Sequence, residues 1–135
     1  MNVIKKLTLA LLVLVPLDLA AQTLTLDDLS PVVVTSTPVA GSSAVAPSTK
    51  EITVTFSKDM MTQKMWSVVQ VEGANFPKIT GQVYFKSDGR TFVIPVALGK
   101  NTVYALSINS RSHTGFKDLK GKPAQPYILS FKTSG

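Results

Sequence analysis

Apolar and polar residues alternate with a period of two along several short stretches of the chain. In the clearest of these, Ile52, Val54 and Phe56 are separated by threonines. This alternation is typical of a β-strand with one buried and one solvent-facing side. The pattern covers residues 51–57, 103–108 and 127–132. We expect these three strands to supply much of the hydrophobic core.

Further β-branched and aromatic segments lie between these strands, and Gly, Pro and Ser separate them. They cover residues 32–35, 66–71, 79–85 and 91–94. A helical turn is expected only at residues 58–64. About seven short strands with such turns predict an all-β fold, an immunoglobulin-like antiparallel β-sandwich.

Several turn signals refine this prediction. Asp88-Gly89 stands between two predicted strands and predicts a hairpin, because glycine accepts the positive φ of a tight turn. The Gly-, Ser- and Pro-rich segment 38–47 predicts a loop that leads the chain to the next strand. Pro123 and Pro126 precede the last strand and predict that it lies at a sheet edge, because proline cannot donate a ladder hydrogen bond.

Tyr104 opens a late strand six residues after Leu98. This spacing is typical of a tyrosine corner, in which the phenol hydroxyl bonds to the backbone of the preceding loop. We therefore expect Tyr104 to have a structural role.

The N-terminus carries Lys5 and Lys6, then an apolar run over residues 7–17, then Ala20 and Ala21. This order is typical of a secretory signal peptide. The run is about half of the roughly 20 residues that cross a bilayer, so no membrane insertion is expected after cleavage. Residues 1–21 are the predicted signal, residues 22–30 a polar lead-in or marginal edge segment, and residues 31–135 one domain. Cleavage before Gln22 is favoured.

The sequence has no cysteine, which excludes disulfides, thiolate metal sites and a lipid anchor on a cysteine. Its formal charge is +6, and removal of two lysines and one aspartate with the signal leaves +5. The basic residues are spread over the chain, so a solvated basic surface is the simpler interpretation and a specific anionic partner is the alternative.

The motifs together resemble a known family. They are the Thr-Ser-Thr-Pro at residues 35–38, the segment 52–60, Leu98 with Tyr104, and the segments 117–121 and 130–133. In order and spacing they resemble a bacterial Ig-like domain of the S-layer type. The resemblance implies a periplasmic or cell-surface module that serves as a spacer, adhesion or accessory domain.

A weaker resemblance, over residues 36–41 and 54–57, is to the periplasmic copper-resistance proteins, which share this sandwich. That family binds Cu(II) through an N-terminal histidine, whereas the chain after cleavage would begin at Gln22. Met60, Met61 and Met65 could offer thioether ligands to Cu(I), or could fill gaps in the core. No metal site is predicted, and copper binding stays an alternative.

Catalytic chemistry is not indicated. His113 is the only histidine, and no Gly-x-Ser-x-Gly elbow accompanies it. The acidic residues lie in separate predicted turns, so no carboxylate pair is expected. We predict no catalytic residue, no cofactor and no enzyme. Nucleic-acid binding is also not expected, because the strand aromatics fall on the inward phase instead of alternating with basic residues.

A binding face remains possible in the less regular middle of the chain. Trp66, Phe76 and Tyr84, with Arg90 near the predicted hairpin, are the candidate ligand-binding residues. Aromatic rings stack on sugars and anchor protein partners. In the alternative interpretation, Trp66 and Phe76 fill the core. We expect a binding, accessory or adhesion module of the envelope whose partner, an envelope protein or a glycan, the sequence does not identify. A carbohydrate-binding module is an alternative to this expectation.

Overall fold

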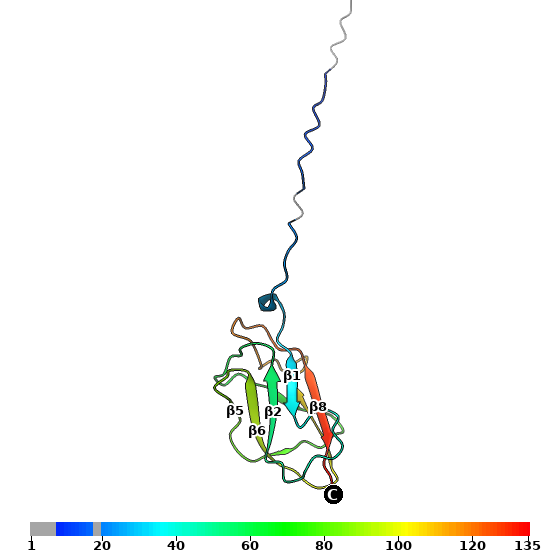
Figure 1. The fold of residues 1–135 in the computed structure, drawn as a ribbon, viewed down its shortest axis with the longest axis vertical. Helices are drawn as coiled ribbons and strands as arrows, with labels where there is room; N and C mark the ends of the chain where they lie inside the picture. Colours follow the sequence, from blue (N-terminus) through cyan, green and yellow to red (C-terminus); the bar gives the residue numbers. More distant parts are fainter. Residues whose placement is uncertain (1–7, 18–19) are drawn as a thin grey trace, which may run out of the picture.

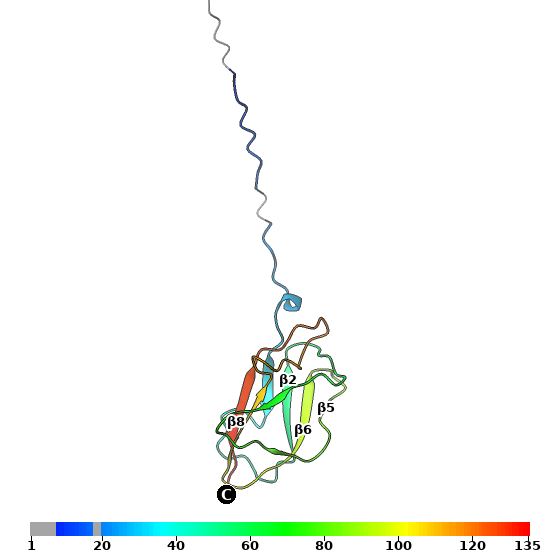
Figure 2. The same ribbon diagram turned by 180° about the vertical axis from the view of Figure 1, so that it is seen from behind.

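The computed structural model describes residues 8–17 and 20–135. Its strands form two antiparallel sheets that pack face to face, as the two opposite views in Figures 1 and 2 show. This confirms the predicted all-β antiparallel sandwich. Residues 20–25 extend away from the sandwich in both views.

The larger sheet contains β1, β2, β6, β4 and β5. Their bounds are Val33–Thr37, Glu51–Phe56, Thr91–Ala97, Lys78–Ile79 and Tyr84–Phe85. β2 lies between β1 and β6. On the side away from β2, β6 pairs with β5 at residues 92–93 and with β4 at residues 96–97. The two short strands therefore share one edge of β6.

The smaller sheet contains β3 (Val68–Gln70), β7 (Val103–Ile108) and β8 (Tyr127–Lys132), with β7 in the middle. β8 lies at an edge, as the two prolines predicted. The loop after β1 covers part of this edge, because Gly41 N donates to Ser130 O and Lys132 N donates to Ser42 O. Such cover protects an edge strand from pairing with another chain.

The core contains the apolar phase of the strands. Ile52, Val54 and Phe56 are at most 1% exposed, which confirms the alternation predicted for β2. Phe92 and Phe116 meet edge to face, with ring centroids 4.8 Å apart. These contacts stabilise a chain that has no disulfide, because aromatic burial contributes much of a small domain's packing energy.

The Tyr104 corner is present as predicted. Tyr104 is 7% exposed, and its hydroxyl oxygen accepts a hydrogen bond from Gly99 N at 2.7 Å. The bond joins the start of β7 to the loop before it. The buried Tyr104 hydroxyl therefore has a hydrogen-bond partner within the protein, as buried polar groups generally do.

Three details of the sequence prediction were wrong. The expected strand at residues 79–85 is divided into β4 and β5, because residues 80–83 leave the ladder at Gly81 and pass over Pro95. The strand expected at residues 66–71 is reduced to β3. Residues 58–64 form no helical turn, since Met60 N and Met61 N donate to the carbonyls of distant residues instead.

The lead-in segment contains a single turn of 3₁₀ helix, η1 (Leu26–Asp28), and no strand. The Asp28 carboxylate accepts hydrogen bonds from the Thr25 amide and hydroxyl, both at 2.8 Å. Lys5, Lys6 and Asp18 lie outside the described residues, so the signal peptide stays a prediction. No helix in the described part of the chain is both long and apolar enough to cross a membrane.

Candidate ligand-binding groove

Two loops form a groove at the β5 edge of the larger sheet. One contributes residues 62–64 and Trp66, the other residues 82–87 and Gly89, and the cavity between them measures about 580 Å³. Its apolar lining comes from Trp66, Val83, Tyr84 and Phe85. A cavity of this size is typical of small-ligand sites. We call it the Trp66 groove.

Trp66 is held in place by the core behind it. Its side chain is partly buried, and its ring centroid lies 5.7 Å from that of Phe92. Gly115 packs directly against the Trp66 backbone, where a Cβ atom would overlap the Trp66 carbonyl. The indole is therefore both a packing element and part of the groove wall.

Tyr84 supplies the exposed aromatic ring of the groove. Alternation along β5 turns Phe85 into the core, where its ring lies 5.0 Å from Phe92. Tyr84 consequently points to the opposite side, and 47% of it is exposed. An exposed aromatic ring on a paired strand is well suited to stacking on a flat ligand.

The hairpin between β5 and β6 shapes one side of the groove. The Asp88 carboxylate accepts hydrogen bonds from the Thr91 hydroxyl at 2.6 Å and from the Arg90 and Thr91 amides at 2.9 Å. These bonds, with the Thr91 hydroxyl contributing most, lower the pKa of Asp88 below its usual value. Gly89 has φ +68°. The predicted Asp88-Gly89 hairpin is confirmed.

Polar side chains complete the groove. Gln63, Gln82, Thr62 and Ser87 provide amide and hydroxyl groups, and two lysines, at positions 64 and 86, provide positive charge. Lys64 is one of the few non-glycine residues with a left-handed backbone, at φ +54°. A non-glycine residue keeps such a conformation only where the surrounding structure holds it, and residues of this kind are frequent at binding sites.

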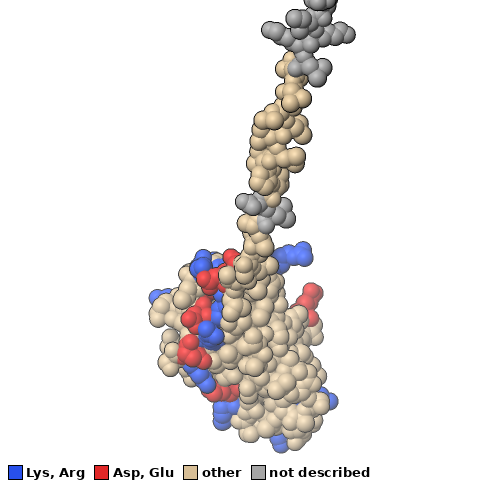
Figure 3. All heavy atoms as spheres, turned by 45° about the horizontal axis from the view of Figure 1, so that its top comes forward, with Lys and Arg blue, Asp and Glu red and all other residues tan. Residues whose placement is uncertain are grey.

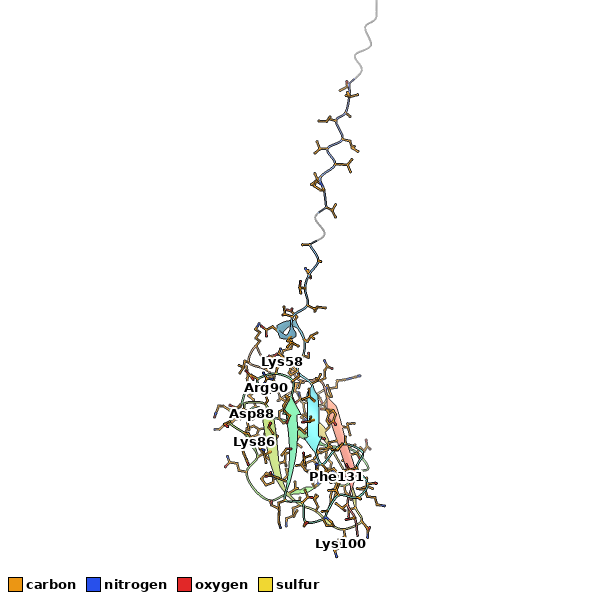
Figure 4. All side chains as sticks on the ribbon, in the orientation of Figure 1. Lys58, Lys86, Asp88, Arg90, Lys100 and Phe131 are labelled. Carbon is orange, nitrogen blue, oxygen red and sulfur yellow. The ribbon has the colours of Figure 1, made fainter. Side chains whose placement is uncertain are left out.

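The structure brings together two of the four residues predicted from the sequence. Trp66 and Tyr84 line the same groove, whereas Phe76 packs against the core and Arg90 lies in a neighbouring hollow. Figure 4 shows Lys86, Asp88, Arg90 and Lys58 in succession up one side of the sandwich. Arg90 Nε donates to Asp59 Oδ1 at 2.7 Å.

The neighbouring hollow measures about 270 Å³ and is lined by three basic and three acidic residues. Each basic residue there forms an ion pair with one of the acidic residues: Lys58 with Asp118, Arg90 with Asp59, and Lys120 with Asp27. Figure 3 shows basic and acidic side chains intermixed on this side of the molecule, next to a broad face without charge. The basic and acidic side chains of the hollow neutralise one another, so the hollow is a weaker candidate than the Trp66 groove for a ligand-binding site.

The polar side chains that line the groove were not among the residues predicted from the sequence. Gln63, Lys64, Gln82 and Lys86 lie within three residues of Trp66 or Tyr84 in the sequence. That proximity was the available signal. This proximity alone did not identify them as site residues, because exposed polar residues are common beside strands. Only the fold shows that the two segments face one groove.

The other candidate residues do not converge on one site. Met60 is 2% exposed and belongs to the core, whereas Met61 and Met65 are partly exposed. His113 is exposed, and its Nδ1 lies 3.1 Å from Ser112 Oγ and 3.2 Å from Ser110 Oγ. Among the described residues, no three His, Cys, Asp or Glu side chains form a group that could hold a metal ion.

Comparison with known proteins supports the fold. A family model described as bacterial Ig-like domain matches residues 27–133, as the sequence motifs predicted. Two solved structures of the S-layer protein SbsC, rSbsC(31-844) and domains 1-6, match with a TM-score of 0.50 and identities of 20% and 21%. Each match covers 80% of this chain and 14% of the S-layer chain, and shows a likeness in fold. No curated protein sequence matches.

Proposed function

The chain belongs to the bacterial Ig-like domain family, and on that premise we propose that it is an exported, non-catalytic binding module of the cell envelope. We propose that the Trp66 groove is its binding site and that a glycan is its ligand. The observation that carries this proposal is the placement of Trp66 and the exposed Tyr84 ring in one groove.

The groove has the chemistry that sugar binding needs. Sugar rings have apolar faces that stack on aromatic side chains, and hydroxyl groups that exchange hydrogen bonds with amides. Tyr84 and Trp66 offer the rings, and Gln63 and Gln82 offer amides that can both donate and accept. A rigid wall favours binding because little conformational entropy is lost on association. The packing of Trp66 on Phe92 provides such a wall.

The shape of the site favours a glycan over a folded protein partner. Stable protein interfaces bury about 1,200 to 2,000 Å² over a broad, often flat surface. The Trp66 groove is a local concavity of about 580 Å³, which fits one or a few sugar rings. A protein partner would instead be indicated by one envelope protein that crosslinks at reproducible stoichiometry.

The cellular location and the absence of catalysis are parts of the proposal. Export is supported by the signal peptide predicted at residues 1–21. A non-catalytic role is supported by the groove lining, which, among the described residues, includes no histidine and no carboxylate to act as general acid or base. Copper binding through methionines would require Met60 to leave the core.

Sedimentation with purified cell-wall glycans would test the proposal. The chain without residues 1–21 should co-sediment with the insoluble polymer. Tyr84→Ala should raise the polymer concentration needed for half-maximal binding about fivefold to tenfold, because a stacked ring contributes about 1 to 1.5 kcal/mol. Ile128→Ala removes a comparably exposed apolar side chain from β8 and should leave binding unchanged.

Two outcomes would contradict the proposal. One is the absence of co-sedimentation with every wall polymer tested. The other is equal binding by Tyr84→Ala and the unmodified chain, which would place the binding surface away from the Trp66 groove.

A further inference from the structure

We propose that the ligand of the Trp66 groove is an anionic saccharide, one that carries carboxylate or phosphate groups along its chain. This inference rests on the proposed function and makes it more specific. It depends on the distribution of charge within the groove, which that proposal does not use.

The groove presents only positive charge. Lys64 and Lys86 line it on opposite loops, and none of its lining residues in the described structure is acidic. Both lysines are exposed, and neither forms an ion pair with another described residue. The Asp88 carboxylate lies outside the groove lining and accepts three hydrogen bonds from Thr91 and Arg90. These bonds lower the pKa of Asp88 most and the charge of Lys86 adds to the effect, but Asp88 and Lys86 form no ion pair.

The basic residues of the neighbouring hollow differ from the two groove lysines in their ion pairing. Its three basic residues each pair with a carboxylate of the same hollow. Both sites lie on the side of the sandwich where Figure 3 shows charged side chains and Figure 4 places Lys86 and Lys58. Of these two sites, only the groove contains lysines that form no ion pair with another described residue. Unpaired lysines beside aromatic rings attract anions at close range and also raise the association rate of an oppositely charged polymer.

The two kinds of group suggest a division of roles. The rings of Trp66 and Tyr84 would contact the apolar face of a sugar, and the two lysines would contact acidic substituents on either side of it. Lys64 extends from a backbone held in the left-handed conformation, which fixes the starting point of its side chain. Lysine binds both carboxylate and phosphate as a compact point charge, so the geometry favours an anionic group without selecting between these two.

Titration of Trp66 fluorescence would test the inference, because Trp66 is the only tryptophan in the chain. The probes are polygalacturonate for carboxylate, poly(glycerol phosphate) for phosphate, and dextran as an uncharged polymer. At least one anionic probe should bind at least about tenfold more tightly than dextran. Lys64→Gln combined with Lys86→Gln should weaken that binding about tenfold, because the ligand then loses two exposed ion pairs, each of which contributes modestly in water.

The matched control is Lys100→Gln, which removes the same charge at the opposite end of the molecule from Lys58 (Figure 4). It should change the affinity less than twofold. Raising the salt concentration from 50 to 500 mM should weaken binding of the unmodified chain and have a smaller effect on the double variant, because salt screens exposed charges.

The outcomes separate the two proposals. Equal affinity for dextran and the anionic probes, or no effect of the double substitution, overturns the anionic inference and leaves the glycan proposal standing. Binding that Lys100→Gln weakens as much as the double variant also overturns it, since the effect is then one of net charge. If no polymer binds at the Trp66 groove, the proposed function fails and the inference fails with it.

Discussion

The Lys58 ammonium lies 2.6 Å from Asp118 Oδ2, and both side chains are largely buried, at 12% and 2% exposure. The Asp118 carboxylate also accepts hydrogen bonds from the backbone amides of Lys120 and Lys122. Lys58 Nζ donates in addition to the Leu29 carbonyl at 3.0 Å. The pair thus joins the end of β2, the loop before β8 and the lead-in segment.

Asp118→Asn should lower the free energy of unfolding by about 3 kcal/mol, because it leaves the Lys58 charge buried without its counterion. Asp27→Asn is the matched control, since it breaks the ion pair with Lys120 at side-chain exposures of 67% and 64%. That change should lower the free energy of unfolding much less, because an exposed ion pair contributes little in water. Urea denaturation at pH 7 measures both, and equal effects would contradict the importance of burial.

The stability of the protein should depend on pH through Asp118. Burial would raise the pKa of this carboxyl, but the hydrogen bonds from Lys58, Lys122 and Lys120 and the Lys58 charge together lower it below its usual value of 3.8. A folded-state pKa below the unfolded value contributes stability that is fully present above the unfolded pKa and is lost as the pH falls through the folded pKa.

Urea midpoints at several pH values would show this effect. The difference in stability between the unmodified chain and Asp118→Asn should stay constant from pH 7 to about pH 5 and should become smaller below about pH 4. A difference that does not change down to pH 2 would mean that Asp118 keeps its ordinary pKa in the folded protein.

Asn109 connects three loops at the centre of a buried polar network. It is fully buried and has φ +58°. Its Nδ2 donates to the carbonyls of Phe116 and Ala124 at 3.0 and 3.1 Å, and its Oδ1 accepts from the Phe116 amide and the Ser67 hydroxyl. The side chain uses both its donor and its acceptor, so no isosteric residue can replace it.

Asn109→Asp should therefore destabilise the protein by at least about 3 kcal/mol, because a buried carboxylate oxygen would face two carbonyl oxygens. Asn101→Asp is the matched control, because Asn101 is exposed and also has a left-handed backbone, at φ +49°. It should change stability by less than about 0.5 kcal/mol. Thermal unfolding compares the two variants, and similar melting temperatures would refute the role of the network.

Gly115→Ala should disturb the wall of the Trp66 groove. The added methyl group would overlap the Trp66 carbonyl and lie 2.7 Å from Ser67 Oγ, so the backbone must shift at a cost of about 2 kcal/mol or more. Gly81→Ala is the control, because its methyl group would meet Pro95 at an ordinary 3.6 Å. The melting temperature measured by calorimetry and the emission maximum of Trp66 should both change in Gly115→Ala and stay the same in Gly81→Ala. An unchanged spectrum would show that the indole does not depend on this contact.

The sandwich and its main strands could be predicted from local patterns in the sequence. The alternation over residues 51–57 predicted β2 because period-two burial needs only the pleat of a strand and one apolar environment. The hairpin at Asp88-Gly89 and the corner formed by Leu98 and Tyr104 were also predicted correctly. Each of these features depends only on residues that are close together in the chain.

Which of these local features come into contact depends on the three-dimensional packing of the chain. In the three-dimensional structure Trp66 and Tyr84 line one groove, Phe76 packs against the core and Arg90 pairs with Asp59. The sequence left open whether Trp66 and Phe76 face a ligand or fill the core. The packing also pairs Lys58 with Asp118, 60 residues apart. Contacts of this kind depend on how two sheets pack and where their loops cross, and neither property leaves a periodic signal in a single sequence.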